Sequence, residues 1–268
     1  MVASGNDFVI VENLAGNLSQ FAKRICQRKT GIGADGLSVL EKTKHADIRM
    51  RVFNPDGSEA AMCGNGARCV AVYLSEIKKI KSKKFSIETK AGEILAQVNK
   101  NNARIKMSHP QDIKLDIPIS VNYRDIKVSF IDTGVPHVCV FVQGLERIDV
   151  AGIGRQIRFH KNFAPRGANV NFIEQVDKDF IKVRTYERGV ESETLACGTG
   201  SVASSIIAFL KGKGAKVAKV KERKFLIKVL TLSTDILKIY FDFKNGRISD
   251  VWLEGPARIV YKGEYYYV

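Results

Sequence analysis

Apolar and polar positions follow two different periods along this chain. Apolar residues alternate with arginines over Ile48–Phe53, the pattern of a half-buried strand. Apolar residues recur at helical spacing over Leu18–Cys26 and near Val150–Ile157, which predicts two amphipathic helices. The same criteria predict further strands at Asp7–Val11, Leu37–Leu40, Phe85–Thr89, Glu93–Val98, Arg104–Met107, Lys127–Asp132, His137–Val142, Asn169–Glu174 and Phe180–Tyr186.

One sequence pattern occurs twice. Ser58-Glu59 precedes Cys63-Gly64-Asn65-Gly66, and Ser192-Glu193 precedes Cys197-Gly198-Thr199-Gly200 at the same spacing. A helix-like run follows each copy, to about residue 77 in the first and to about residue 211 in the second. The offset, 197 − 63 = 134, is half of the 268-residue length. We therefore expect two similar domains that each offer one cysteine to a shared cleft.

The order of these elements predicts an α+β fold rather than a βαβ repeat. We expect two pseudosymmetric domains, each a mainly antiparallel β sheet wrapped around the central helix that begins after its cysteine. The stretch Pro110–Pro118 is interpreted as the linker, which gives an N-terminal domain over residues 1–117 and a C-terminal domain over residues 118–268. Asn245-Gly246 is typical of a type I′ hairpin turn in the second domain.

Composition narrows the setting in which the protein acts. No apolar run approaches the roughly 18 residues that span a bilayer, and no signal peptide is expected at the N-terminus. Five cysteines without a framework spacing indicate a reducing, cytoplasmic location. The net charge of +15 leaves open a nucleic-acid partner, but the lysines are scattered and no aromatic stacking row accompanies them. We therefore favour a lysine-rich solvated surface, which also attracts small acidic substrates.

The chemistry of the duplicated turn points to acid–base catalysis. Gly-x-Gly at a helix start directs backbone N–H groups outward and favours an anion, either a phosphate or a carboxylate. No Walker lysine or dinucleotide fingerprint accompanies it. A cysteine at this position is expected to have a pKa below the free value of about 8.5. The alternative, that both are buried structural thiols, is favoured for either cysteine alone but not for a matched pair.

The remaining cysteines are predicted to be packing residues. Cys26 lies on an apolar helix stripe, Cys69 in the first central helix and Cys139 in an apolar strand. They form no Cys-x-x-Cys pair, so no metal site is expected. Glu59 and Glu193 are expected to hydrogen-bond local backbone and hold each turn. Arg68 is expected at the surface or in support of the site.

An ordered set of motifs makes the chain resemble the diaminopimelate epimerase family nearly from end to end. The residues that carry the resemblance are Gly5-Asn6-Asp7-Phe8, Gly31–Gly36, Phe53–Glu59, Cys63–Asn65, Gly134–His137, Asn169–Phe172, Tyr186–Gly189, Cys197–Gly200 and Gly255-Pro256. The resemblance implies a cofactor-independent isomerase of lysine and peptidoglycan biosynthesis that interconverts LL- and meso-diaminopimelate. It also implies that the segment from residue 256 to 268 returns to the first domain.

The resemblance also assigns roles to individual residues. Cys63 and Cys197 would be the two bases, and Gly64-Asn65 and Gly198-Thr199 would hold the carboxylate at the reacting centre. His137 and Glu187 would influence protonation of the thiols, and Tyr261 would lie at a homodimer contact. The residues implied to bind the amino groups and the distal carboxylate are Asn6, Asn54, Asn169, Glu187 and Arg188.

A proline or hydroxyproline racemase-like enzyme of the same fold remains as a second hypothesis. Glu187-Arg188 and the asparagine set argue against it, because those substrates lack a second amino-acid head. An isomerase of the phenazine-biosynthesis type would share the fold but would not need both cysteines. A basic nucleic-acid-binding protein is the hypothesis from outside enzymology, and a steep salt dependence of DNA affinity would indicate it. The sequence thus favours a small-molecule substrate and no nucleic-acid or membrane partner.

Overall fold

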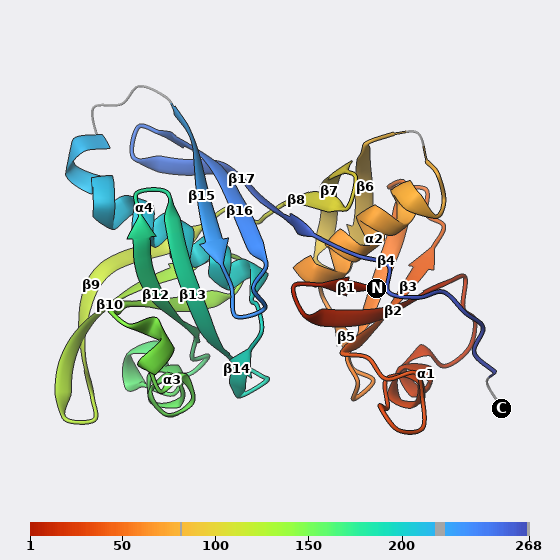
Figure 1. Cartoon of the computed structure of the whole chain (residues 1–268), viewed down its shortest axis with the longest axis horizontal. Helices are drawn as coiled ribbons and strands as arrows, with labels where there is room; N and C mark the ends of the chain where they lie inside the picture. The colour runs from red at the N-terminus through yellow and green to blue at the C-terminus, as the bar shows by residue number, and fades with distance from the viewer. Residues whose placement is uncertain (81, 218–222, 267–268) are drawn as a thin grey trace. The chain divides into compact units, whose positions relative to one another are not determined.

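The computed structural model describes residues 1–80, 82–217 and 223–266. Their contacts divide the chain into two compact units (Figure 1). Unit 1 contains Met1–Lys106 together with the C-terminal segment that starts at Glu254, and unit 2 is Met107–Leu253. The boundary therefore lies earlier than the one placed after residue 117 from the sequence.

Unit 1 consists of short strands around one long helix. Its elements are β1 (Val2–Ala3), β2 (Asn6–Glu12), α1 (Leu18–Ile25), β3 (Gly36–Glu41), β4 (Ile48–Phe53), β5 (Glu59–Ala60), α2 (Gly64–Glu76), β6 (Lys84–Thr89), β7 (Gly92–Asn99) and β8 (Asn102–Lys106). Helix α2 contacts β1, β2, β4, β7 and β8, so it is the central element of the unit. Most of its side chains are buried, which explains why its sequence is apolar on nearly all sides.

Unit 2 repeats this arrangement around α4. Its elements are β9 (Gln111–Val121), β10 (Arg124–Asp132), β11 (Pro136–Phe141), the 3₁₀ turn η1 (Leu145–Arg147), α3 (Val150–Arg158), the 3₁₀ turn η2 (Lys161–Phe163), β12 (Asn169–Asp177), β13 (Phe180–Glu187), β14 (Ser192–Thr194), α4 (Gly198–Val217), β15 (Arg223–Leu230), β16 (Ile236–Lys244) and β17 (Arg247–Pro256), whose last three residues belong to unit 1. Helix α4 contacts strands β10 to β13, β15 and β16. It extends beyond the predicted end near residue 211.

Strand pairing follows the same scheme in both units, and antiparallel pairs predominate as predicted. In unit 1, β2 pairs parallel with β3 across α1, β3 antiparallel with β4, and β4 parallel with β6 across α2. In unit 2, β11 pairs parallel with β12 across α3, β12 antiparallel with β13, and β13 parallel with β15 across α4. Each unit therefore contains two parallel crossovers through a helix within a mainly antiparallel sheet, which agrees with the predicted α+β class. The pseudosymmetric fold itself is confirmed.

The predicted linker is a strand. Pro110–Pro118 overlaps β9, which pairs antiparallel with β10 with Pro118 opposite Lys127. Proline is tolerated in a strand whose N–H side carries no ladder bond. The turn at Asn245-Gly246 lies between β16 and β17, and both residues have positive φ, as a type I′ turn requires.

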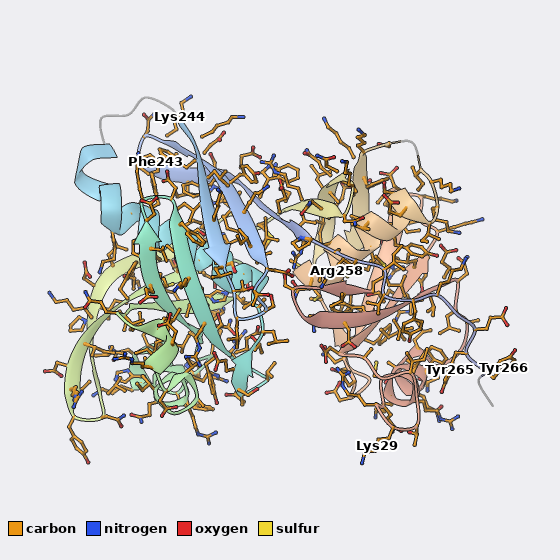
Figure 2. The ribbon with its side chains drawn as sticks, viewed as in Figure 1. Lys29, Phe243, Lys244, Arg258, Tyr265 and Tyr266 are labelled. Atoms are coloured by element: carbon orange, nitrogen blue, oxygen red, sulfur yellow. The ribbon has the colours of Figure 1, made fainter. Side chains whose placement is uncertain are left out.

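The C-terminal segment and the N-terminal strand meet within unit 1. Val2 and Arg258 exchange two backbone hydrogen bonds of 2.9 Å. Farther along, Tyr265, which is labelled in Figure 2, lies edge-on to Phe21 of α1 with 6.3 Å between ring centroids. Because Phe21 belongs to the apolar stripe of α1, the segment covers part of a face that the helix would otherwise expose.

Candidate active site

In unit 1, Cys63 lies at the N-terminus of the central helix. It caps α2 with extended backbone angles, and its Sγ accepts the Gly66 N–H at 3.5 Å. A side chain that accepts from the first turn is the usual N-cap arrangement. The half-buried thiol therefore sits at the positive end of the helix dipole, next to Gly64-Asn65.

Two of the predicted binding residues of unit 1 contact each other. Asn65, in the first turn of α2, donates from Nδ2 to Oδ1 of Asn6 at the start of β2, a long contact of 3.5 Å. Asn54 lies in the exposed loop after β4, where its Nδ2 donates to Ser58 Oγ at 2.9 Å. Ser58 is held in turn by Asp56. Unit 1 thus brings Asn6 and Asn65 together and places Asn54 on a separate, locally stabilised loop.

In unit 2, Cys197 occupies the equivalent place before α4. Its Sγ accepts the Gly200 N–H at 3.4 Å, and the Thr199 hydroxyl lies 3.4 Å from the same sulfur. The Ser201 hydroxyl donates to the Cys197 carbonyl at 2.9 Å. Position 200 has room only for glycine, because a Cβ there would lie 2.3 Å from Asn171 Oδ1. The glycine therefore lets a buried amide lie directly against the helix start.

A buried carboxylate accompanies the second thiol. Glu187, at the end of β13, accepts hydrogen bonds from the hydroxyl of Thr194, at 2.6 Å, and from the thiol of Cys197. Burial raises the pKa of Glu187, and these hydrogen bonds offset only part of the rise. Burial first, and then the Glu187 carboxylate, raise the pKa of Cys197 above its usual range. The expected lowering by the helix N-terminus is therefore wrong for Cys197, because desolvation and a neighbouring negative charge outweigh it.

His137 is a neutral hydrogen-bonding residue. Thr185 donates to Asn171 Oδ1 at 3.0 Å, so the Asn171 amide nitrogen faces His137 Nδ1 at 3.1 Å. An amide nitrogen only donates, so Nδ1 accepts and the proton resides on Nε2. Complete burial, followed by the charge of Arg188, lowers the pKa of His137 to about 3. Nε2 is buried and has no hydrogen-bond partner among the described residues.

Asn171 was not singled out from the sequence as a site residue. It stands in the Asn169-Val170-Asn171 motif, and strand alternation places both asparagines on one face. That face is buried at both positions, and a buried amide needs partners to offset its desolvation. The sequence feature that could have revealed Asn171 is therefore an asparagine in an otherwise apolar strand.

Asn169 and Arg188 are joined through the backbone. The Arg188 N–H donates to Asn169 Oδ1 at 2.9 Å, and Asn169 Nδ2 donates to the Pro136 carbonyl at 3.1 Å. The Arg188 guanidinium reaches the Arg166 carbonyl at 3.4 Å. Asn169 is thus placed to hold the start of the loop that carries Arg188.

The two turn glutamates form equivalent ion pairs rather than local backbone contacts. Glu59 binds Arg51 with distances of 2.8 and 3.0 Å, and Glu193 binds Arg184 with distances of 2.6 and 2.8 Å. Each arginine lies on the strand that pairs with the glutamate's own strand. The expectation of backbone hydrogen bonds was wrong, although the glutamates do tie the turn to the sheet. Arg68 is fully buried, which excludes a surface position for it.

The three other cysteines are buried, as predicted. Burial raises the pKa of Cys26 to about 11 and the pKa values of Cys69 and Cys139 to about 12, so all three remain thiols at neutral pH. No group of possible metal ligands occurs among the described residues. None of the helices in the described part of the chain combines the length and the apolar character that a membrane span requires.

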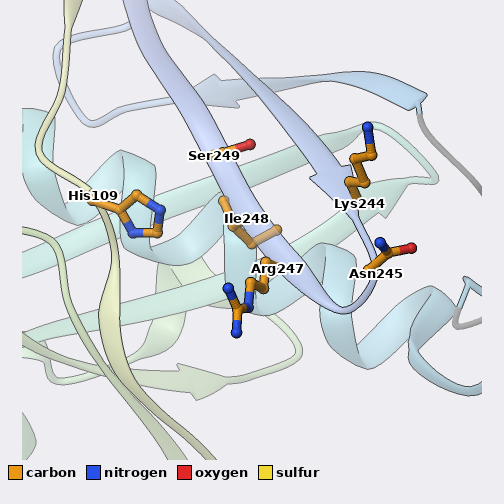
Figure 3. A pocket seen from close by; sticks show the side chains of 6 residues that line it. All are labelled: His109, Lys244, Asn245, Arg247, Ile248 and Ser249. Atoms are coloured by element: carbon orange, nitrogen blue, oxygen red, sulfur yellow. The ribbon is translucent and has the colours of Figure 1, made fainter.

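A pocket beside the turn between β16 and β17 contains none of the predicted site residues (Figure 3). It is lined by His109, Lys244, Asn245, Arg247, Ile248 and Ser249.

Tyr261, the predicted dimer contact, is exposed in the C-terminal segment, with Val260 beside it also exposed.

Comparison with known proteins identifies the family. The model of the diaminopimelate epimerase family matches residues 1–112 and 129–231. The chain belongs to the diaminopimelate epimerase family. It is 40% identical to a diaminopimelate epimerase from Aquifex aeolicus over 97% of this chain and 94% of the relative. It is 42% identical to one from Methanothrix thermoacetophila over 97% and 92% of the two chains.

Solved structures that share the fold are more distant. A phenazine biosynthesis protein of the PhzF family from Bacillus anthracis matches with a TM-score of 0.68 at 20% identity, over 96% of this chain and 92% of that one. A hydroxyproline epimerase from Agrobacterium vitis matches with a TM-score of 0.66 at 16% identity, over 95% and 88%. At these identities the matches show the fold alone.

Proposed function

We propose that this protein interconverts LL- and meso-diaminopimelate without a cofactor, in lysine and peptidoglycan biosynthesis. The observation that carries the proposal is the duplicated thiol: each unit places one cysteine at the N-terminus of its central helix. Full-length relatives at 40% identity that are named diaminopimelate epimerases support the choice of substrate.

The reaction requires one cysteine to be deprotonated while the other carries its proton. Inversion at a carbon begins when a thiolate removes the α-proton from one face, leaving negative charge that spreads onto the adjacent carboxylate. A thiol then delivers its proton to the opposite face, so one thiolate and one thiol are regenerated with their roles exchanged. The N–H groups of the helix starts would hold that carboxylate, and such a donor is worth about 3 kcal/mol in a transition state.

The surroundings of Cys197 support its role as the thiol in the resting protein. Its pKa is raised, and Glu187 accepts its hydrogen bond. We assign Cys63 as the complementary base in that direction, with the roles reversed for the return reaction. His137, being neutral, would act as a fixed hydrogen-bond donor rather than as a charge.

Binding of the rest of the substrate is assigned to the predicted polar residues. The carboxylate at the reacting centre would be held by Gly64-Asn65 and Gly198-Thr199. The distal carboxylate would pair with Arg188, whose planar fork suits bidentate binding. The amino groups and the remaining contacts are assigned to Asn6, Asn54, Asn169 and Glu187.

We further propose that the protein is a cytoplasmic homodimer. All five cysteines are free thiols, which supports a reducing compartment. Exposed apolar side chains at Val260 and Tyr261 support a contact in the C-terminal segment.

One assay tests the reaction directly. The protein is incubated with LL-diaminopimelate in deuterated water, and the products are separated and analysed by mass spectrometry. We expect meso product that carries deuterium at one α-carbon. Absence of meso product, or meso product without label, would refute the proposed reaction.

A further inference from the structure

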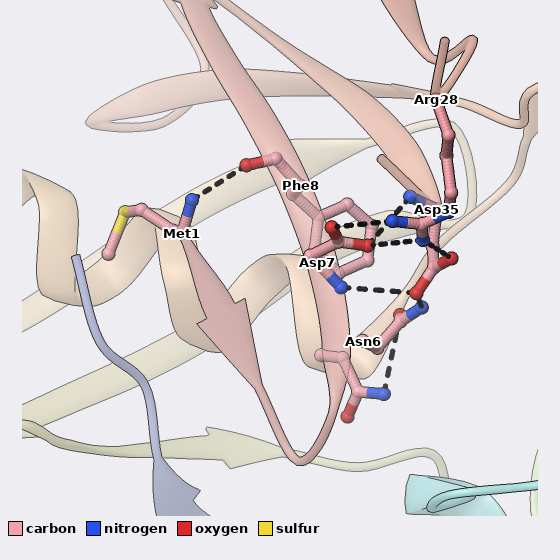
Figure 4. A network of polar contacts seen from close by, with 7 residues as sticks. Met1, Asn6, Asp7, Phe8, Arg28 and Asp35 are labelled. Atoms are coloured by element: carbon pink, nitrogen blue, oxygen red, sulfur yellow. Dashed lines mark hydrogen bonds and ion pairs between the residues drawn. The ribbon is translucent and has the colours of Figure 1, made fainter. Parts of the chain in front are cut away.

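A chain of hydrogen bonds in unit 1 joins the two asparagines of the candidate site to two charged residues. At one end, Arg68 on α2 donates from Nη2 to Asn65 Oδ1 at 2.5 Å. Asn65 Nδ2 then donates to Asn6 Oδ1 at 3.5 Å. At the other end, Asn6 Nδ2 donates to Asp35 Oδ2 at 3.0 Å (Figure 4). All four residues belong to the same compact unit.

The two ends of this chain differ in what they can do. A guanidinium carries only donors, and a carboxylate only accepts. Arg68 is fully buried and also donates to Ser4 Oγ at 3.1 Å, so it is held in place. Asp35 accepts from Arg28 at 2.7 Å and from the Asp7 N–H at 3.2 Å (Figure 4). Arg68 can therefore only donate to this series of hydrogen bonds, and Asp35 can only accept from it.

An asparagine amide between such ends has one favourable orientation. Its oxygen and nitrogen are nearly equal in size, so only neighbouring donors and acceptors decide which way the group faces. Reversing Asn6 would set its oxygen against the Asp35 carboxylate, and reversing Asn65 would set its amide hydrogens against the Arg68 guanidinium. One reversal sets two acceptors against each other, and the other sets two donors against each other. Both groups are partly buried, so the free-energy cost of either reversal is larger than it would be in water.

We propose that Arg68 and Asp35 are positioning residues that set the orientation of the Asn65 and Asn6 amides. Each amide keeps one N–H and one lone pair outside the chain, and these are the groups left to bind a substrate that carries carboxylates and amines. The proposal rests on the proposed function for the identity of that substrate. The orientation of the amides does not depend on it.

The decisive variant is Asp35→Asn. Asparagine has the same shape as aspartate, but its amide donates as well as accepts. This end of the hydrogen-bonded series therefore no longer dictates which way the Asn6 amide faces. We expect KM for diaminopimelate to rise about tenfold or more, with a smaller fall in kcat, because Asn6 is assigned to bind parts of the substrate away from the reacting carbon.

Asp7→Asn is the matched control. Asp7 also binds Arg28, at 3.1 Å, and accepts the Asp35 N–H at 2.9 Å, but no hydrogen bond joins its side chain to Asn6 among the described contacts. The control therefore removes the same charge and weakens the same arginine contact. We expect its KM to change clearly less than that of Asp35→Asn. Equal changes in the two variants, or a KM within twofold of wild type for Asp35→Asn, would refute the proposal.

A second measurement does not depend on variants or on activity. A neutron crystal structure of the wild-type protein, exchanged into deuterated water, locates the deuterons on each amide nitrogen. We expect deuterons of Asn6 to face Asp35 and deuterons of Asn65 to face Asn6 Oδ1. Either amide in the reverse orientation would overturn the proposal, even if the protein epimerises diaminopimelate. Correct orientations with no epimerase activity would refute the proposed function and leave the orienting role standing.

Discussion

The two cysteine turns have the same backbone arrangement and differ in the side chains around it. Each thiol accepts the N–H three residues later, at 3.5 Å in unit 1 and 3.4 Å in unit 2. Each turn is tied to the sheet by a bidentate arginine–glutamate pair. In unit 1 the residue two positions after the thiol is Asn65, whose amide donates to Asn6. Around Cys197 the polar groups nearby are the Thr199 hydroxyl and the Glu187 carboxylate.

This difference shows what a duplicated scaffold can keep and what it can change. The helix start and the ion pair set the position of a thiol, so both units need them. The residues beside each thiol differ, and under the proposed function they would set its protonation and its contacts with substrate. Under the proposed function, two thiols in the same geometry would make the two proton transfers of one inversion, one as the base and the other as the acid.

The largest loss of activity is expected when either thiol is removed. Cys63→Ala and Cys197→Ala should each reduce epimerisation by about a thousandfold or more, because each removes a group that transfers a proton. The assay is formation of meso-diaminopimelate, with circular dichroism to show that the fold is retained. Substantial turnover in one variant would mean that the two turns are not equivalent in function.

Removing Arg188 tests whether unit 2 selects the distal end of the substrate. Arg188→Ala should lower kcat/KM by an amount equivalent to roughly 2–5 kcal/mol, since a bound carboxylate would lose its charged partner. The comparison is the ratio of activity on diaminopimelate to activity on a simple amino acid. If that ratio stays the same, Arg188 does not bind the distal carboxylate.

Glu187→Gln sharpens the contrast in protonation. Because the Glu187 carboxylate raises the pKa of Cys197, removing its charge should lower that pKa, although burial keeps the pKa above its ordinary value. The pH profile of Cys197 alkylation by iodoacetamide should therefore move to lower pH, as peptide mass spectrometry can follow. Alkylation of Cys63 in the same samples is the internal control. A profile for Cys197 that moves to higher pH would contradict the assigned contact.

The smallest effects should come from the paired arginines. Arg51→Met and Arg184→Met should each lower the free energy of unfolding by about 1 kcal/mol, because both bidentate pairs are partly exposed. Arg184 also donates to the carbonyls of Leu145 and Ile148, so its variant should be the less stable. Urea titrations of the two proteins compare them directly. A larger loss for Arg51→Met would show that these backbone contacts contribute nothing.

Much of the fold could be predicted because local patterns and tertiary contacts agree. The alternation at Ile48–Phe53 and the apolar stripe at Leu18–Cys26 became β4 and α1. Residues 111–121 carry an equally clear alternation, yet the prolines at 110 and 118 led to a linker assignment. The strand forms because β10 supplies the partner, and no local pattern shows that a partner is present.

The duplication, the two thiols and the helix that each thiol caps could be recognised from the sequence alone. These depend on motifs whose residues are neighbours in the chain, so spacing alone reveals them. The raised pKa of Cys197, the neutral state of His137 and the hydrogen-bonded series from Arg68 to Asp35 could not be recognised without the folded structure. Each of these depends on burial or on partners that are distant in the sequence. Desolvation and hydrogen-bond direction act through space, and the order of residues does not specify which groups will meet.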